Sequence, residues 1–204
     1  DELRTAILRA VSHDLRSPLA SIKASASSLR QTDVDWSPAA RAEFLASIET
    51  ETDRLTSIVT NLLDLSRLEA GVLRPVMQSV SLEEVVPAAV YGLGDRSHQV
   101  VFDFADDLVE IMTDPALLER VVANLVGNAI HWSPAESPVR LQAQQVADRV
   151  LLQIIDHGPG IPAEQRSRLI QPFHRLNDSG TGAGLGLGLA IADRLLAAMH
   201  CELQ

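Results

Sequence analysis

The sequence predicts an α+β protein in which a helical hairpin precedes a layered domain of strands and helices. In the first 70 residues, apolar side chains recur every three or four positions, which is the spacing of one helix face. From Ser81 onward, helix-like segments alternate with strand-like segments, which is typical of α/β and α+β layer structures. We place the boundary between about Gly71 and Ser79, which gives domains at 1–71 and 79–204.

Composition excludes several classes of protein. Of the 204 residues, 46% are hydrophobic but only 3% are aromatic, so the core is expected to be aliphatic. The net charge of -10 argues against a nucleic-acid partner, which needs clustered Lys and Arg. A single cysteine, Cys201, excludes a disulfide framework and a cysteine zinc site. No membrane span or signal peptide is visible, and the chain begins at Asp1 within helical periodicity. We therefore expect a piece of a longer protein, with any membrane attachment outside this chain.

The hairpin is predicted from two apolar stripes and their end signals. The first helix runs to about Leu29, and a polar turn follows. The second starts near Ser37 and Pro38, because serine caps a helix and proline fits its first turn, and it stops at Gly71. Two helices of about 40 Å expose more apolar surface than one hairpin can cover. We therefore expect a homodimer, in which two hairpins form a four-helix bundle that buries this apolar surface.

The second domain is predicted from six further signals. Helices are expected at 82–90, at 115–130 after Thr113-Asp114, and at 185–199. An extended run is expected at 100–104, and strands at 139–146 and 150–155. The last of these strands is nearly all apolar, which indicates a buried strand.

His13 is the most informative residue of the first helix. At about 100° per residue it lies roughly 180° from the midpoint of Val11 and Leu15, which belong to the apolar stripe. The imidazole is therefore predicted to point at solvent, where a folded core has no use for it.

Two glycine-rich turns in the second half are candidates for phosphate binding. Asp156-His157-Gly158-Pro159-Gly160 follows a strand, and residues 180–188 alternate glycine with other residues before a helix. Glycines before a helix let backbone N–H groups approach phosphate. The first turn also matches a loose dinucleotide fingerprint, but the acid expected about 20 residues later is missing. A simple tight turn is the alternative. Asp156 is best explained as an acceptor for an exocyclic amine such as that of adenine.

Asn124 and Asn128 lie four residues apart and therefore share one helix face. Amide oxygens suit Mg²⁺, which borrows one or two protein oxygens and takes its other ligands from water and phosphate. The alternative is a polar stripe on a half-buried helix.

Taken together, these motifs resemble those of the sensor histidine kinases. The stretch Ser12-His13-Asp14-Leu15-Arg16-Ser17-Pro18-Leu19, the two asparagines, the Asp156 turn and the second glycine loop occur in that family's order. Residues 21–30, 33–36 and 61–71 are most similar to the KdpD-like subfamily, the potassium-responsive kinases.

This resemblance implies a dimerisation and phosphotransfer hairpin followed by a Bergerat-type α/β sandwich that binds ATP with Mg²⁺. It makes His13 the phosphoacceptor, which then passes the phosphoryl group to an aspartate of a response-regulator receiver domain. Asp14 would orient His13 and accept its proton, and Ser17 would present a hydroxyl on the same face. The resemblance also implies the cytoplasmic part of a membrane-anchored sensor, with a potassium or osmotic response.

In the nucleotide domain, the resemblance assigns Mg²⁺ and phosphates to Asn124 and Asn128, and adenine to Asp156. It also implies that Gly158 and Gly160 shape the adenine pocket and that Phe173 and Arg175 lie on its lid side. Three further glycines would line the triphosphate: Gly182, Gly184 and Gly186. His131 and Trp132 stand where the family has Lys and then Tyr or Phe, so a protonated His131 would partly replace that cation. The chain ends where the family continues into further strands, so C-terminal strands are expected to be missing.

Two alternatives remain open. The departures at His131 and Trp132 fit a catalytically weak dimeric scaffold, or a phosphatase acting on a response regulator. An ATPase of the wider Bergerat group would release phosphate without a phosphohistidine.

Overall fold

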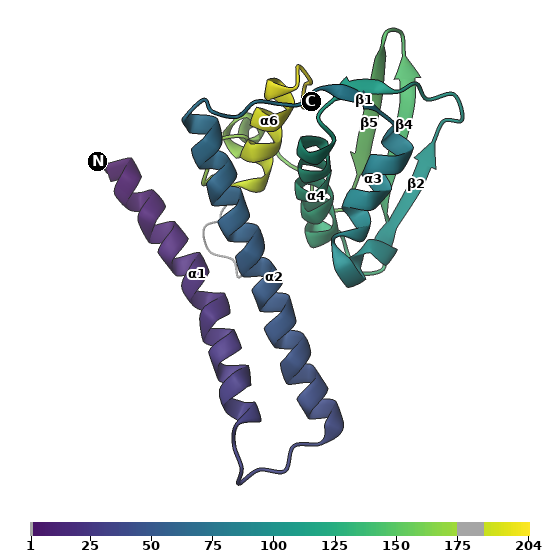
Figure 1. The fold of residues 1–204 in the computed structure, drawn as a ribbon. Coiled ribbons are helices and arrows are strands. Elements are labelled where there is room, and N and C mark those ends of the chain that lie inside the picture. The colour runs from purple at the N-terminus through teal and green to yellow at the C-terminus, as the bar shows by residue number, and fades with distance from the viewer. Residues whose placement is uncertain (1, 175–185) are drawn as a thin grey trace.

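The structure is a computed structural model that describes residues 2–174 and 186–204, with the backbone alone for residues 2–10, 95 and 96. It consists of a long helical hairpin and a layered α/β part beside the hairpin's second helix (Figure 1). The predicted α+β class, a helical part followed by an α/β part, is confirmed. Of the predicted site residues, Arg175, Gly182 and Gly184 lie outside the described residues.

The hairpin is formed by α1 (Glu2–Leu29) and α2 (Pro38–Glu69). Ser37 caps α2, since its Oγ accepts a hydrogen bond of 3.1 Å from the Ala40 backbone N–H. The helix ends before Gly71, whose φ of +62° suits glycine.

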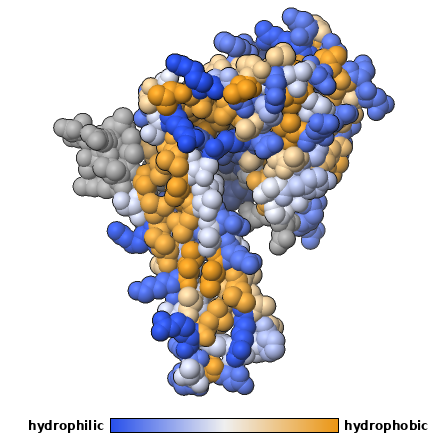
Figure 2. Space-filling view, viewed as in Figure 1, coloured by the Kyte–Doolittle hydropathy of each residue, from blue (hydrophilic) through white to orange (hydrophobic). Residues whose placement is uncertain are grey.

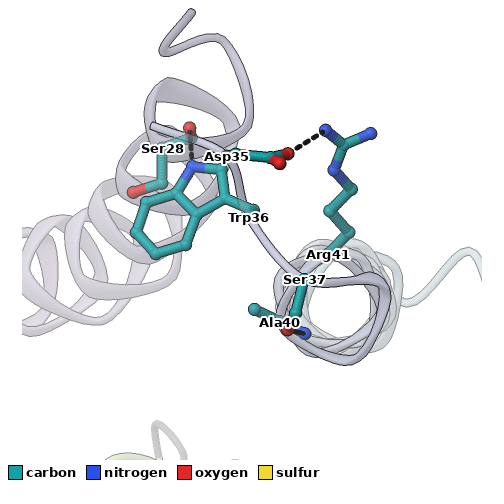
Figure 3. A network of polar contacts seen from close by, with 6 residues as sticks. All are labelled: Ser28, Asp35, Trp36, Ser37, Ala40 and Arg41. Atoms are coloured by element: carbon teal, nitrogen blue, oxygen red, sulfur yellow. Dashed lines mark hydrogen bonds and ion pairs between the residues drawn. The ribbon is translucent and has the colours of Figure 1, made fainter. Parts of the chain in front are cut away.

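The turn of the hairpin is held by an aromatic side chain (Figure 3). The Trp36 Nε1–H donates to the Ser28 carbonyl at 2.8 Å, and the indole packs edge-to-face on Phe44. An ion pair of 3.8 Å joins Asp35 and Arg41. Hydrogen bonding and ring packing therefore fix the connector between the helices, which the sequence predicted only as a polar turn.

The layered part has two small sheets. The first pairs β1 (Gln78–Val80) antiparallel with β3 (Ile111–Thr113). The second has the order β2-β4-β5, in which β4 runs parallel to β2 and antiparallel to β5. Its strands span Val100–Phe104, Val139–Val146 and Arg149–Ile155.

Helices cover one face of the three-stranded sheet. The helices of this part are α3 Leu82–Tyr91, the 3₁₀ helix η1 Gly94–Gln99, α4 Pro115–Trp132, α5 Ala163–Leu169 and α6 Gly188–Ala198, and α3 and α4 are the two that pack in the core at the sheet. The core between α3, α4 and the sheet is aliphatic, as the composition predicted, and includes the fully buried Val86, Val122, Val126, Val139 and Leu141. Asp114 caps α4, since one carboxylate oxygen accepts from the Leu117 N–H at 3.1 Å.

Two predictions about this domain need correction, and four short elements were missed. Strand β5 is not buried, because helices cover only one face of its sheet and Leu151 and Ile155 on the other face are exposed. Helix α6 begins at Gly188 instead of residue 185, because Gly186 has a φ of +66° that no α-helix contains. The short elements β1, β3, η1 and α5 were not predicted, since each is too short to establish a periodicity.

No helix among the described residues combines the length and apolar character that crossing a bilayer requires.

Candidate functional site

The His13 side chain stands out from the hairpin and is 82% exposed. Its Nδ1 lies 3.0 Å from the Asp14 Oδ1. When the imidazole is neutral and Nδ1 carries the hydrogen, this contact is a hydrogen bond to the carboxylate, and the lone pair is on Nε2. Ser17 is exposed one helical turn later, and the next residue, Pro18, is buried within α1. The hairpin therefore presents an imidazole nitrogen to solvent as a nucleophile.

The two asparagines of α4 point toward the start of α6. A Cβ placed on Gly188 would lie 3.6 Å from the Asn124 Oδ1 and 3.8 Å from the Asn128 Nδ2. Both asparagines are half-buried. Since α6 begins at Gly188, its free N–H groups and the positive end of its dipole lie beside these amides. Amide oxygens and a helix N-terminus together suit a cation and the phosphates that it accompanies.

The Asp156 turn lies against the C-terminal end of α4. The Gly158 N–H donates to the Asp156 Oδ1 at 2.7 Å, and the His157 N–H donates to the Ser133 Oγ at 3.2 Å. A Cβ on Gly158 would meet the Trp132 Cβ at 3.1 Å and the Trp132 carbonyl oxygen at 3.2 Å. The turn is therefore fitted closely onto α4, and Asp156 is exposed beside it. Gly160 has a φ of +75°, which glycine adopts most readily.

Two aromatic rings stand at this end of α4. Trp132 is 46% exposed, and the His131 ring packs edge-to-face on it with ring centroids 5.1 Å apart. Trp132 therefore borders the Asp156 turn, where the resemblance expects adenine, and the His131 ring packs on its indole. An exposed indole beside a carboxylate offers a flat apolar surface and a hydrogen-bond acceptor, which are the two features that a purine needs.

A hydrogen bond of 3.2 Å joins Phe173 and Gly186, since the Phe173 N–H donates to the Gly186 carbonyl. Both residues have a φ of +66°. Phe173 also packs against a second apolar cluster, which contains Leu187 and Ile191. The structure therefore brings Phe173 and Gly186 together, although the sequence carried no signal for a left-handed phenylalanine.

The described residues thus bring the predicted nucleotide residues to two places along α4. Asn124 and Asn128 lie with the start of α6, whereas the Asp156 turn lies at the C-terminal end of α4, where the His131 ring packs on Trp132. The sequence analysis missed Ser133, because only the fold shows that its hydroxyl accepts a hydrogen bond from the His157 N–H of the Asp156 turn. Among the described residues, no group of three or more His, Cys, Asp or Glu is arranged to hold a metal ion. The amide oxygens fit a cation that takes its other ligands from phosphate and water.

Comparison with known families divides the chain into two matching regions. Residues 3–71 match the His Kinase A (phospho-acceptor) domain, and residues 113–204 match the histidine kinase-, DNA gyrase B- and HSP90-like ATPase family.

Similar proteins match over nearly the whole chain. The sensor protein KdpD of Mycobacterium tuberculosis is 45% identical over 98% of this chain, which spans 24% of that relative's length. The histidine kinase AdeS of Acinetobacter baumannii has a similar structure, with a TM-score of 0.65, 25% identity, and coverage of 94% of this chain and 89% of AdeS. Full-length ShkA, solved in complex with AMPPNP, gives a TM-score of 0.63 at 26% identity over 95% of this chain and 41% of its own.

Proposed function

Because the chain belongs to the sensor histidine kinases, we propose that it transfers the γ-phosphoryl group of ATP to His13 and from there to an aspartate of a response-regulator receiver domain. One observation carries this proposal. The His13 ring is 82% exposed and its Nδ1 contacts a carboxylate, which orients Nε2 outward as the attacking atom. Asp14 holds the ring and takes up the proton as the imidazole is phosphorylated.

The two domains take separate roles in this proposal. Residues 1–71 form the dimerisation and phosphotransfer hairpin, and residues 79–204 form the ATP-binding domain. An apolar stripe along the hairpin (Figure 2) supports a homodimeric four-helix bundle, and the single hairpin leaves four large apolar side chains exposed: Leu19, Leu45, Val59 and Leu63. Burying such a stripe against a second copy removes apolar surface from water.

The nucleotide site follows from the two groups along α4. Asn124 and Asn128 would hold Mg²⁺ and the phosphates at the start of α6, and Asp156 would accept the exocyclic amine of adenine. Mg²⁺ would neutralise charge that develops on the transferring phosphoryl group. His131 and Trp132 would border the purine, and Gly158 and Gly160 would keep the turn close to α4. For Phe173 and Gly186, we propose that their hydrogen bond holds Gly186 near the start of α6, where it would line the triphosphate.

For the physiological response, we propose potassium or osmotic sensing by the longer protein. The support is the identity to KdpD sensor proteins and the KdpD-like stretches of the hairpin. A second candidate function is a weak kinase that acts chiefly as a scaffold or as a phosphatase. His131 and Trp132, which stand where the family has a fixed cation and then Tyr or Phe, favour it.

The test is incubation of the chain with γ-labelled ATP and Mg²⁺. We expect acid-labile, alkali-stable label that is lost in His13→Gln. The control is His200→Asn, which removes another exposed histidine at a left-handed position that asparagine tolerates. A wild-type chain that binds ATP but acquires no label would favour the scaffold. Phosphate release that persists unchanged in His13→Gln would indicate an ATPase instead.

A further inference from the structure

The end of α4 carries a hydroxyl group that contacts the Asp156 turn. Ser133 is the residue at which α4 ends, and its backbone N–H donates to the Ala129 carbonyl at 3.0 Å. The Ser133 Oγ in turn accepts a hydrogen bond of 3.2 Å from the His157 N–H. The hydroxyl is therefore held by the last turn of a helix and bonds to the residue directly after Asp156.

The loop that follows Ser133 is held by contacts of its own. The Ser137 N–H donates to the Pro134 carbonyl at 2.9 Å. The Gln99 side chain, at the end of η1, donates through its Nε2 to the Ala135 carbonyl at 3.4 Å. Because the helix on one side of Ser133 and the loop on the other are both fixed, its hydroxyl has little freedom to follow the turn if the turn moves.

The direction of the Asp156 carboxylate is set by the position of its own turn. Its Oδ1 accepts a hydrogen bond of 2.7 Å from the Gly158 N–H, which ties the side chain to the backbone two residues later. Asp156 is exposed, and its Oδ2 has lone pairs with which to accept from a ligand. Gly158 packs on Trp132, but packing is less directional than a hydrogen bond. The Ser133 hydroxyl therefore contributes the directional contact between the turn and α4.

One helix positions both ends of the proposed nucleotide site. Asn124 and Asn128 lie on α4 beside the start of α6, and Ser133 follows Asn128 by five residues. At a rise of about 1.5 Å per residue, Ser133 lies about 7.5 Å farther along the axis than Asn128. The helix fixes this separation, so the distance between the purine and the phosphates is fixed once the Asp156 turn is fixed to the helix end.

We propose that Ser133 is a positioning residue for purine recognition, whose hydroxyl fixes the Asp156 turn on α4 so that the carboxylate meets the exocyclic amine of the purine. This inference rests on the proposed nucleotide site. Ser133 acts through the His157 N–H and itself touches neither the purine nor the phosphates. Without the hydroxyl, the His157 N–H loses its acceptor on α4, and the turn is free to shift toward water. The chain then binds the purine less tightly, while the phosphate end of the site is unchanged.

The test compares two side chains of the same shape at position 133 of the full chain. Ser133→Thr keeps the hydroxyl, whereas Ser133→Val replaces it with a methyl group. Both side chains suit the extended backbone of Ser133, which has a φ of -74° and a ψ of 146°. By displacement of a fluorescent ATP analogue, Ser133→Thr should bind ATP within about twofold of wild type, and Ser133→Val about threefold to tenfold more weakly. Ser137→Ala is the control, because it removes a hydroxyl from the same loop and keeps the backbone N–H that bonds to Pro134.

A second ligand shows whether the hydroxyl acts through the Asp156 carboxylate. Purine riboside triphosphate has hydrogen in place of the exocyclic amine, so the carboxylate has no amine to meet. We expect it to bind wild type and Ser133→Val with affinities that agree within about twofold, because the two changes act on the same contact. The rate of His13 labelling at saturating ATP should be equal in Ser133→Val and Ser133→Thr, since the purine end of ATP is remote from the reacting phosphoryl group.

The proposal is overturned if Ser133→Val binds ATP as tightly as Ser133→Thr does. It is overturned equally if the loss in Ser133→Val is as large for purine riboside triphosphate as for ATP, because the hydroxyl would then act on the whole site and not on the carboxylate. If Ser133→Val does not fold, Ser133→Ala takes its place with the same expected results. Failure of the kinase proposal is distinct, since the wild-type chain would then acquire no label, whereas these affinities are measured by binding alone.

Discussion

Replacing Gly158 with alanine should displace the Asp156 turn from α4. A Cβ at this position would lie 2.9 Å from the Asp156 Oδ1, 3.1 Å from the Trp132 Cβ and 3.2 Å from the Trp132 carbonyl oxygen. The carboxylate can rotate away, but it then gives up its 2.7 Å hydrogen bond from the Gly158 N–H. The two Trp132 atoms belong to the end of a helix and cannot move alone. The turn must therefore shift by several tenths of an ångström.

The size of the effect follows from these contacts. Inserting one methyl group into a well-packed contact costs about 1–3 kcal/mol. A misplaced Asp156 also loses a hydrogen bond from a carboxylate to the purine, which contributes about 1.5–3 kcal/mol. We therefore expect ATP affinity to fall about tenfold to a hundredfold. The loss should be larger for ATP than for inorganic triphosphate, because the change lies at the purine end of the site.

The assay is displacement of a fluorescent ATP analogue, with unfolding by urea measured in parallel. Gly127→Ala is a matched control, because the same methyl group on α4 meets no atom within 4 Å. It should leave ATP affinity unchanged and stabilise the helix by up to about 1 kcal/mol. If Gly158→Ala binds ATP as tightly as Gly127→Ala does, the proposed position of the purine beside Asp156 is wrong.

Two further predictions concern stability. Asp114→Ala removes the two hydrogen bonds that the carboxylate accepts, from the Leu117 N–H at the start of α4 and from the Val76 N–H of the linker. The free energy of unfolding in urea should therefore fall by about 2 kcal/mol. A loss below about 0.5 kcal/mol would show that these two hydrogen bonds do not both stabilise the fold. Burial raises the pKa of Asp64 above its ordinary 3.8, so the folded protein binds this proton more tightly than the unfolded chain does. The resulting contribution to the free energy of unfolding is fully present below pH 3.8 and is lost as the pH rises through the raised native pKa. Asp64→Asn cannot lose that proton and should therefore gain stability relative to wild type as the pH rises above 3.8, whereas a pH-independent difference would show that Asp64 is not perturbed.

The helices and the central strands could be predicted because they carry long, regular signals. Ser37 with Pro38 and Asp114 with Pro115 mark helix starts chemically, and the structure has both caps. The exposure of His13 also followed from helical periodicity alone, since one face of the helix carries the apolar stripe and the opposite face is therefore exposed to solvent. Which face of a strand is buried depends on what the rest of the chain covers. The apolar run of β5 was therefore misread, and its outer side chains are exposed.

The parts that were missed depend on contacts between distant segments. Nothing near Asp64 in the sequence indicates that Arg120, 56 residues later, is its partner. The hydrogen bond between Phe173 and Gly186 likewise joins two residues that lie 13 positions apart in the sequence. The grouping of the candidate nucleotide residues along α4 was expected from family resemblance, and the distances from Gly158 and Gly188 to α4 are physical support that sequence alone does not supply.

The most direct measurement is the site and chemical form of the phosphoryl group after reaction with Mg-ATP, determined by mass spectrometry of peptides and by phosphorus NMR of the intact chain. Because the Nδ1 of His13 is engaged by Asp14, we expect a single phosphoimidazole at His13 with phosphorus bonded to Nε2. Phosphate on any other side chain, or on Nδ1 of this ring, would contradict it.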